Sequence, residues 1–195
     1  LECLAWKPQN LSRATAVLAR LARIEINDNW ANKPISSLGA IYRSWMPQTA
    51  ASLEERCKAL ELLTKRYPDI GWEICIEQFS LGPQMGNYSY RPHWRSDASG
   101  AGQPVKTRKE IKGFVRKALD LTLCWKKHDE RTLGDLAERL QGMPEEDRAT
   151  VWDLIDIWLQ KPETTDRAKA TLRERIRLFA LTRLARRRGL EEGTR

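Results

Sequence analysis

Apolar side chains recur every three to four residues along nearly the whole chain, which is the spacing of one face of an α-helix. The pattern is clear from about Leu11 to Glu25. The expected apolar stripe of this first stretch consists of Ala14, Val17, Leu18, Leu21 and Ile24. No segment of similar length alternates apolar and polar residues as a half-buried strand does. The sequence therefore predicts an all-α fold.

Prolines and capping residues mark the expected helix ends. Ser52 and Glu55 have the spacing of a capping box, in which the two side chains bond to each other's backbone N–H groups. The same reasoning predicts caps at Asn10 or Ser12, Asp69, Thr132, and Thr164 or Thr165. Prolines and a glycine predict a helix from Pro34 to Pro47, one that starts near Pro144, and a last helix that ends at Gly189.

The tryptophans lie on the predicted apolar stripes, so we expect most of them in the core. The indoles expected to be buried are those of Trp6, Trp45, Trp72, Trp125, Trp152 and Trp158. The stripe expected between Thr107 and Lys127 consists of Ile111, Val115, Ala118, Thr122 and Trp125.

Short turns that contain proline join the predicted helices, which favours antiparallel neighbours. A weak internal similarity at an offset of 42 residues aligns Leu11, Leu18 and Leu21 with Leu53, Leu60 and Leu63. This period lies in the range of HEAT-type hairpins. The predicted architecture is one of paired antiparallel amphipathic helices, arranged as a HEAT-like short solenoid or as an irregular helical bundle. Helical hairpins are expected over 1–81 and 107–195, with a long loop over 82–106, within one continuous α domain.

The first residues, Leu1 to Trp6, are apolar and include neither an initiator Met nor a basic segment. We therefore expect the chain to be a fragment of a larger protein, in which these residues continue an upstream helix. No stretch approaches the roughly 18 apolar residues of a membrane span. The four cysteines are far apart and form no C-x-x-C pair. They are expected to be small buried hydrophobic residues, and a reducing cytoplasm fits them best.

The sequence contains no recognisable catalytic constellation. Its two histidines, His93 and His128, lack metal-ligand spacing from another His or Cys. There is no Gly-rich phosphate loop, nucleophile elbow or H-E-x-x-H pair. We therefore expect no enzyme activity from this chain and assign no catalytic residue, metal ligand or cofactor.

One segment departs from the helical pattern, because 82–104 is rich in Gly, Pro, Ser and aromatic residues. Cations follow it into the next helix, where Lys109, Lys112 and Arg116 share a face. The candidate contact residues for a partner or a nucleic acid are Tyr88, Tyr90, Arg91, Trp94, Arg95, Lys106, Arg108, Lys109, Lys112 and Arg116. Aromatic and cationic side chains together can grip a phosphate backbone and stack on bases. A solvated helix face beside a packed loop explains the same residues.

Several phrases of the sequence resemble a known group of proteins. They include Leu1-Glu2-Cys3-Leu4-Ala5-Trp6, Asn29-Trp30-Ala31-Asn32-Lys33-Pro34, Trp45-Met46-Pro47-Gln48-Thr49, Arg91-Pro92-His93-Trp94-Arg95 and Leu172-Arg173-Glu174-Arg175-Ile176-Arg177. Together they resemble the helical C-terminal region of large uncharacterised bacterial STAND-type NTPases of the antiviral defence or conflict-system kind. The resemblance implies a sensor or scaffold region. It assigns no functional residue, because these phrases are not active-site motifs.

Two hypotheses of function follow. In the first, the chain is a helical-repeat interaction module that binds a trigger protein or another domain of its parent chain. In the second, it is a helical nucleic-acid-binding domain that uses the surface from Arg91 to Arg116. The net charge of +8 raises the odds of an acidic partner in both cases. A membrane partner is not expected.

Overall fold

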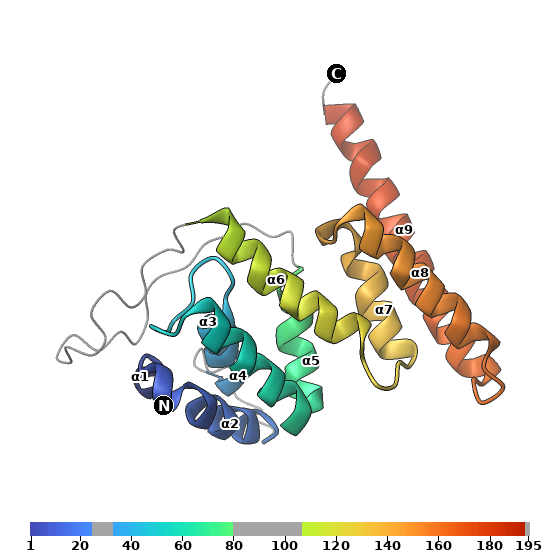
Figure 1. Ribbon diagram of the computed structural model, residues 1–195. Helices are drawn as coiled ribbons and strands as arrows, with labels where there is room; N and C mark the ends of the chain where they lie inside the picture. The colour runs from blue at the N-terminus through green and yellow to red at the C-terminus, as the bar shows by residue number, and fades with distance from the viewer. Residues whose placement is uncertain (25–32, 80–106, 194–195) are drawn as a thin grey trace. The chain divides into compact units, whose positions relative to one another are not determined.

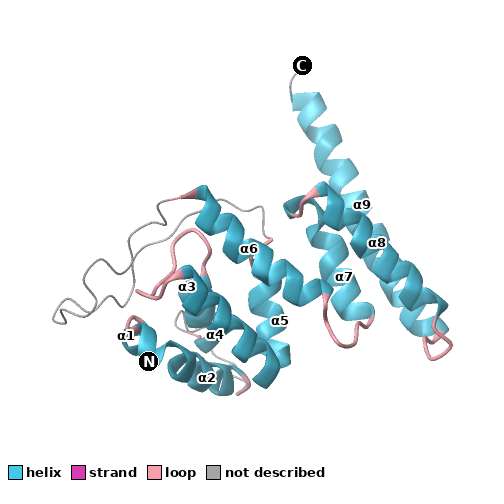
Figure 2. Ribbon diagram, viewed as in Figure 1, coloured by secondary structure: helices cyan, strands magenta, loops and turns pink. Residues whose placement is uncertain are grey.

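The chain is helical, with no strand, throughout the part that the structure describes (Figure 2). The computed structural model describes residues 1–24, 33–79 and 107–193, the last ten of them as helical backbone. Every helix from α2 to α9 is longer than two turns. The predicted all-α class is therefore confirmed, whereas the HEAT-like arrangement stays a prediction.

The chain forms two compact units, Leu1–Cys124 and Trp125–Arg195. The helices of the first unit (Figure 1) are α1 (Glu2–Ala5), the 3-10 turn η1 (Pro8–Asn10), α2 (Leu11–Ala22), α3 (Pro34–Tyr42), α4 (Leu53–Arg66), α5 (Pro68–Glu77) and α6 (Arg108–Leu123). The sequence divides the chain at the loop 82–106, whereas the structure divides it after Cys124. The reason is that α6 packs against α4 and α5 and so belongs to the first unit.

Helix α4 organises the first unit, because it packs against α2, α5 and α6. The predicted capping box at its start is confirmed: the Ser52 N–H donates to Glu55 at 2.8 Å, and the Glu55 N–H donates to Ser52 at 3.3 Å. Its buried residues are Arg56, Ala59, Leu60, Leu63 and Thr64. Apolar periodicity alone would not place an arginine among these buried residues.

Helix α2 turns a different face to the core from the one that the sequence predicts. Ala14 and Leu18 are buried as expected, but Val17, Leu21 and Ile24 are 42%, 37% and 60% exposed. The helix instead buries its small residues, which allow α3 and α4 to approach closely. One of them is Thr15, whose hydroxyl donates to the carbonyl oxygen of Leu11 at 2.9 Å. Hydropathy alone underrates such a face.

The predicted helix from Pro34 to Pro47 is too long, since α3 ends at Tyr42. The residues that follow are irregular but mostly buried. Two hydrogen bonds hold this segment to the start of the chain: Thr49 Oγ1 donates to Ala5 O at 2.7 Å, and the Ala50 N–H donates to Trp6 O at 3.0 Å. An irregular segment can be buried without a large cost in free energy when its polar groups have hydrogen-bond partners, as they do here.

The second unit consists of α7 (Glu130–Arg139), the 3-10 turn η3 (Leu140–Gly142), α8 (Glu145–Gln160) and α9 (Asp166–Gly193). Helix α7 packs against both α8 and α9. The core of this unit is small, and its buried apolar residues are Leu133, Leu136, Ala137, Met143, Val151, Ile155, Trp158 and Leu172.

Several predicted helix ends differ from those observed. The cap of α7 is Asp129, with Thr132 as its capping-box partner three residues later. Asp69 lies in the first turn of α5 and binds Arg23 instead of capping the helix. The last helix passes Gly189 and ends at Gly193, whereas Thr165 does cap its start by accepting from the Ala168 N–H at 3.2 Å.

The prediction of buried indoles is correct for Trp6, Trp72 and Trp158. It is wrong for Trp152, which is 43% exposed, and Trp45 and Trp125 are only half-buried. Along α8 the buried positions are Val151, Ile155 and Trp158. Trp152 lies about 100° around the helix from Val151, so it falls outside that stripe.

Candidate functional site

Six of the predicted contact residues lie outside the residues that the structure describes. They are Tyr88, Tyr90, Arg91, Trp94, Arg95 and Lys106. The other four, Arg108, Lys109, Lys112 and Arg116, lie on α6, and all four are exposed. The prediction that Lys109, Lys112 and Arg116 form a solvent-facing basic surface agrees with their exposure. We call Arg108, Lys109, Lys112 and Arg116 the α6 basic face.

The members of the α6 basic face differ in their partners. Arg116 forms an i,i+4 ion pair with Asp120, and its Nε donates to Oδ1 at 2.7 Å. Lys109 and Lys112 have no ion pair within the described part of the chain. Lys109 lies in the first turn of α6, where a positive charge is repelled by the helix dipole, and Lys112 lies just beyond that turn. The neighbouring carboxylate, Glu110, points instead to the buried Arg56, at 2.7 Å.

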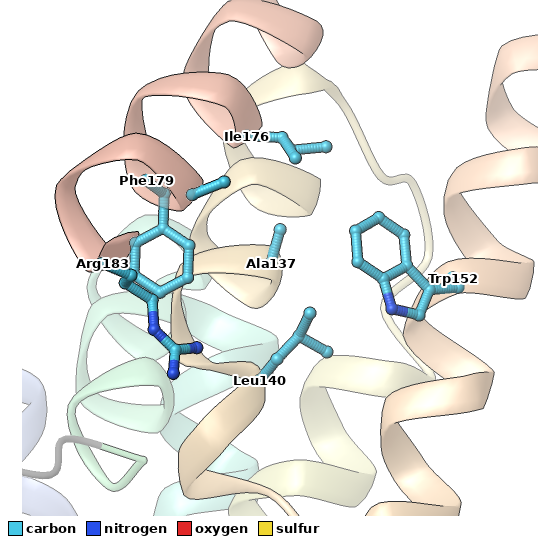
Figure 3. A pocket seen from close by; sticks show the side chains of 7 residues that line it. Ala137, Leu140, Trp152, Ile176, Phe179 and Arg183 are labelled. Atoms are coloured by element: carbon cyan, nitrogen blue, oxygen red, sulfur yellow. The ribbon is translucent and has the colours of Figure 1, made fainter. Parts of the chain in front are cut away.

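A pocket of about 380 Å³ lies within the second unit, between α7, α8 and α9. Figure 3 shows its walls: Trp152 of α8 faces Phe179 and Ile176 of α9, with Ala137 and Leu140 between them. Six of its seven lining residues are apolar, two of them alanines, and Arg183 is the one charged group that lines it. The side chain of Arg183 lies along the Phe179 ring, 5.6 Å from its centre. We call this the α7–α9 pocket.

The packing of α9 explains why the pocket is open. Leu172 is the one buried residue of α9 among those whose side chains the structure describes. Beyond it, Arg175 ties the helix to α7, donating to Glu138 at 2.6 Å and to Asp135 at 2.5 Å. Burial lowers the pKa of Arg175, but these two hydrogen bonds outweigh it and leave the pKa above its usual value. The ion pairs thus hold α9 against α7 while its apolar side chains stay accessible.

Further apolar side chains of the second unit are exposed near the pocket helices. Ile157 of α8 is 58% exposed, and Leu178 and Leu181 of α9 are 52% and 48% exposed. None of these three side chains lines the α7–α9 pocket, so they are accessible apolar groups of the second unit apart from it.

A second pocket of about 380 Å³ lies between α2 and α4 in the first unit. Its lining mixes an apolar floor, including Leu62 and Leu63, with the cations Arg13, Lys65 and Arg66. Lys65 is paired with Glu61 at 2.7 Å, and Arg66 lies over the ring of Tyr67. Tyr67 is its one aromatic lining residue, so it has no pair of facing aromatic side chains such as Trp152 and Phe179.

Among the described residues, no three His, Cys, Asp or Glu side chains lie close enough together to hold a metal ion. Within the same residues, no helix combines the length and the apolar character of a bilayer span. Comparisons of the chain with protein-family models, with curated proteins and with solved structures gave no match.

Sequence reasoning missed the α7–α9 pocket because it assigned Trp152 to the core. A signal was present: Trp152 is out of phase with Val151, Ile155 and Trp158, which form the regular stripe of α8.

Proposed function

We propose that this chain is a non-catalytic protein-interaction module whose binding surface is the α7–α9 pocket. The observation that carries the proposal is the exposed indole of Trp152, which faces Phe179 across an apolar pocket (Figure 3). An indole left 43% exposed forgoes much of the free energy that burial would contribute, about 25 cal/mol per Å². A partner that covers it recovers that free energy.

The chemistry of the lining residues supports the same function. Binding energy at protein interfaces is concentrated in Trp, Tyr and Arg side chains that lie in central pockets. The α7–α9 pocket brings together Trp152 and Arg183 with aliphatic neighbours. A sensor or scaffold role, which the resemblance to the helical region of STAND-type NTPases implies, is consistent with such a surface. In a HEAT-like arrangement the helix pairs would provide the rigid support.

The experiment that tests this function is site-specific photo-cross-linking in cells of the source organism. A photoreactive phenylalanine analogue replaces Trp152, and in a control protein it replaces Gln160, an exposed residue at the end of the same helix. We expect a protein adduct at position 152 and none at position 160. Equal labelling at both positions, or no protein adduct at 152, would rule out the interaction surface.

A second candidate function, nucleic-acid binding, is favoured by the α6 basic face. Lys109 and Lys112 are exposed cations without ion pairs in the described part of the chain, and Lys109 lies in the first turn of α6, where the helix dipole disfavours it. A phosphate backbone would offset that repulsion. Replacing Lys109 and Lys112 by Ala should weaken binding to oligonucleotides of any sequence and reduce its salt dependence.

A titration of labelled single- and double-stranded oligonucleotides near physiological salt tests the second candidate. Affinity weaker than about 10⁻⁴ M, the loose end of non-specific binding, would remove it. The matched control is Arg116→Ala, because Arg116 already has Asp120 as a partner and should contribute less.

A further inference from the structure

We infer that the partner held in the α7–α9 pocket is an amphipathic helix with acidic residues at one end of its apolar face. This inference rests on the proposed function and adds the class of partner. It follows from the shape of the accessible surface, from the position of the unpaired arginines and from the charge of the chain's own apolar surfaces.

The shape favours an elongated partner. From Leu172 to Arg183, α9 rises by about 17 Å at 1.5 Å per residue. Over that length its pocket-lining residues are Ile176, Phe179, Ala180 and Arg183, at helical spacing along one face. Helices that dock into grooves insert residues at i, i+3, i+4 and i+7, which span about 10 Å. The lining stretch of α9 from Ile176 to Arg183 has about the same length, because seven residues of helix rise by about 10 Å.

The charges favour an acidic partner. Two of the five arginines of α9 whose side chains the structure describes have carboxylate partners: Arg175 binds Asp135 and Glu138, and Arg177 binds Glu174. Arg183 has no carboxylate within ion-pair distance in the described residues, although it lines the pocket. A carboxylate on the partner would pair with it in a partly desolvated place, where charge-assisted hydrogen bonds are strong.

The arginine positions also predict which end of the partner is acidic. Arg148 precedes Trp152 by one turn on α8, and its Nε donates to the carbonyl oxygen of Met143 at 3.1 Å, not to a carboxylate. Arg183 follows Phe179 by one turn on α9. Because α8 runs toward the turn at 161–165 and α9 runs away from it, both arginines lie at the end of the pocket far from that turn. Asp156 lies one turn beyond Trp152, at the end of the pocket near the 161–165 turn. The acidic end of the partner is therefore expected at the opposite end, beside Arg148 and Arg183.

The α2 face of a second copy is a poorer occupant, because its exposed Val17 and Leu21 lie beside the cations Arg13 and Arg20. Docking such a face next to Arg183 and Arg148 would bring like charges together, which costs free energy in a partly desolvated interface. The α8 face of a second copy, where Ile157 lies beside Asp153 and Asp156, is the alternative that the light-scattering measurement below tests.

The probe for this inference is a designed amphipathic peptide of 16 residues with leucines at i, i+3, i+4 and i+7 and glutamates at one end of that face. Two matched peptides replace the glutamates by glutamine or by lysine. Binding to the full chain is measured by fluorescence anisotropy near physiological salt. We expect the glutamate peptide to bind at least tenfold more tightly than the lysine peptide, an effect of the size that close charge pairs give.

Two substitutions locate the site. Trp152→Ala should weaken binding of the glutamate peptide at least tenfold, and Arg183→Glu should reverse the preference toward the lysine peptide. The controls are Ile157→Ala and Arg173→Glu, which change exposed residues of the same helices that do not line the pocket. Each control should leave the dissociation constant within about twofold. Circular dichroism checks that every variant keeps its helices.

Three results would overturn the inference. One is equal affinity for all three peptides, which includes no binding of any of them. Another is binding that Trp152→Ala leaves unchanged. The last is a dimer of the chain, seen by light scattering, that Trp152→Ala abolishes, because the occupant would then be a second copy. In the first two cases, cross-links from position 152 to another protein would still support the proposed function. The absence of such cross-links would contradict the proposed function whatever the peptides do.

Discussion

Arg56 of α4 and Glu110 of α6 are joined by an ion pair, with Nη2 of the arginine 2.7 Å from Oε1 of the glutamate. The Arg56 side chain is 1% exposed, and its guanidinium also lies 5.1 Å from the centre of the Phe114 ring. Its Nε and Nη1 atoms are buried without a hydrogen-bond partner. Burial lowers the pKa of Arg56, and the negative charge of Glu110 acts in the opposite direction. The first unit therefore depends on this one carboxylate to stabilise a buried cation.

Removing Glu110 should consequently destabilise the protein more than removing the arginine does. Glu110→Ala is expected to cost about 2–3 kcal/mol, because it leaves the Arg56 cation buried without its carboxylate. We place the cost at the lower end of the usual range since the Glu110 side chain is 33% exposed. Arg56→Met removes the charge and two unpartnered donors, and should cost about 1 kcal/mol or less. Urea unfolding followed by far-UV circular dichroism measures both.

The double variant provides the control for this prediction. In the Arg56→Met background, Glu110→Ala should cost no more than about 0.5 kcal/mol, because no buried cation is left to stabilise. Equal costs of Glu110→Ala in the two backgrounds would show that the ion pair does not contribute.

Gly71 is predicted to resist substitution although it lies inside a helix. A Cβ built on Gly71 would lie 2.6 Å from the backbone Cα of Thr64, where α5 crosses α4. The gain of about 1 kcal/mol in helix propensity from Gly71→Ala is outweighed by overpacking of about 1–3 kcal/mol against rigid backbone. Thermal unfolding should therefore show a lower Tm.

Gly113→Ala is the matched control for Gly71. A Cβ on Gly113 of α6 would meet the end of the Leu53 side chain at 3.0 Å, and that side chain can move. The propensity gain should then appear, so the variant is expected to be as stable as the parent or up to about 1 kcal/mol more stable. A destabilised Gly113→Ala together with a neutral Gly71→Ala would contradict the observed packing.

Acid should weaken the first unit through Glu61. Hydrogen bonds from Lys117 and Lys65 lower the pKa of Glu61 from 4.5 to about 2. A carboxyl whose folded pKa is depressed stabilises the fold above its unfolded pKa, and this contribution is lost as the pH falls from about 4.5 toward 2. Glu61→Gln should flatten the dependence of the unfolding midpoint on pH in that window. Because the group is exposed, added salt should reduce the difference between parent and variant. A parallel pH dependence in the two proteins at low salt would be evidence against the pairing.

The four cysteines should differ widely in reactivity. The expectation that all are buried is wrong for Cys3 and Cys124, which are exposed, while Cys57 is half-buried and Cys75 is buried. Burial raises the pKa of Cys75 to about 12 and also raises that of Cys57. Since the thiolate is the reactive form, a thiol reagent at pH 8 should modify Cys3 and Cys124 first and Cys57 more slowly. Cys75 should react after denaturation; rapid modification of Cys75 in the folded protein, read by mass spectrometry, would count against its burial.

Periodicity in the sequence determined the class of fold and most of the helices. Helices depend on local spacing and on capping residues, so the capping box of Ser52 and Glu55 could be predicted without the structure. The sequence did not predict which face each helix turns toward its neighbours. Thr15 and Ala19 of α2 are buried, and Val17 is not, because close packing against α3 and α4 selects small side chains that hydropathy underrates.

Tertiary structure alone decided which residues form the candidate site. The cations of α6 were predicted from sequence, since exposed charge on one helix face is a local property. The α7–α9 pocket joins Ala137, Trp152 and Phe179 from three helices. Its existence depends on how far each helix is covered by the others, and in particular on Arg175 holding α9 to α7 by ion pairs. Contacts between residues about 40 positions apart have no local signature, so the side chain that sequence assigned to the core became the wall of a pocket.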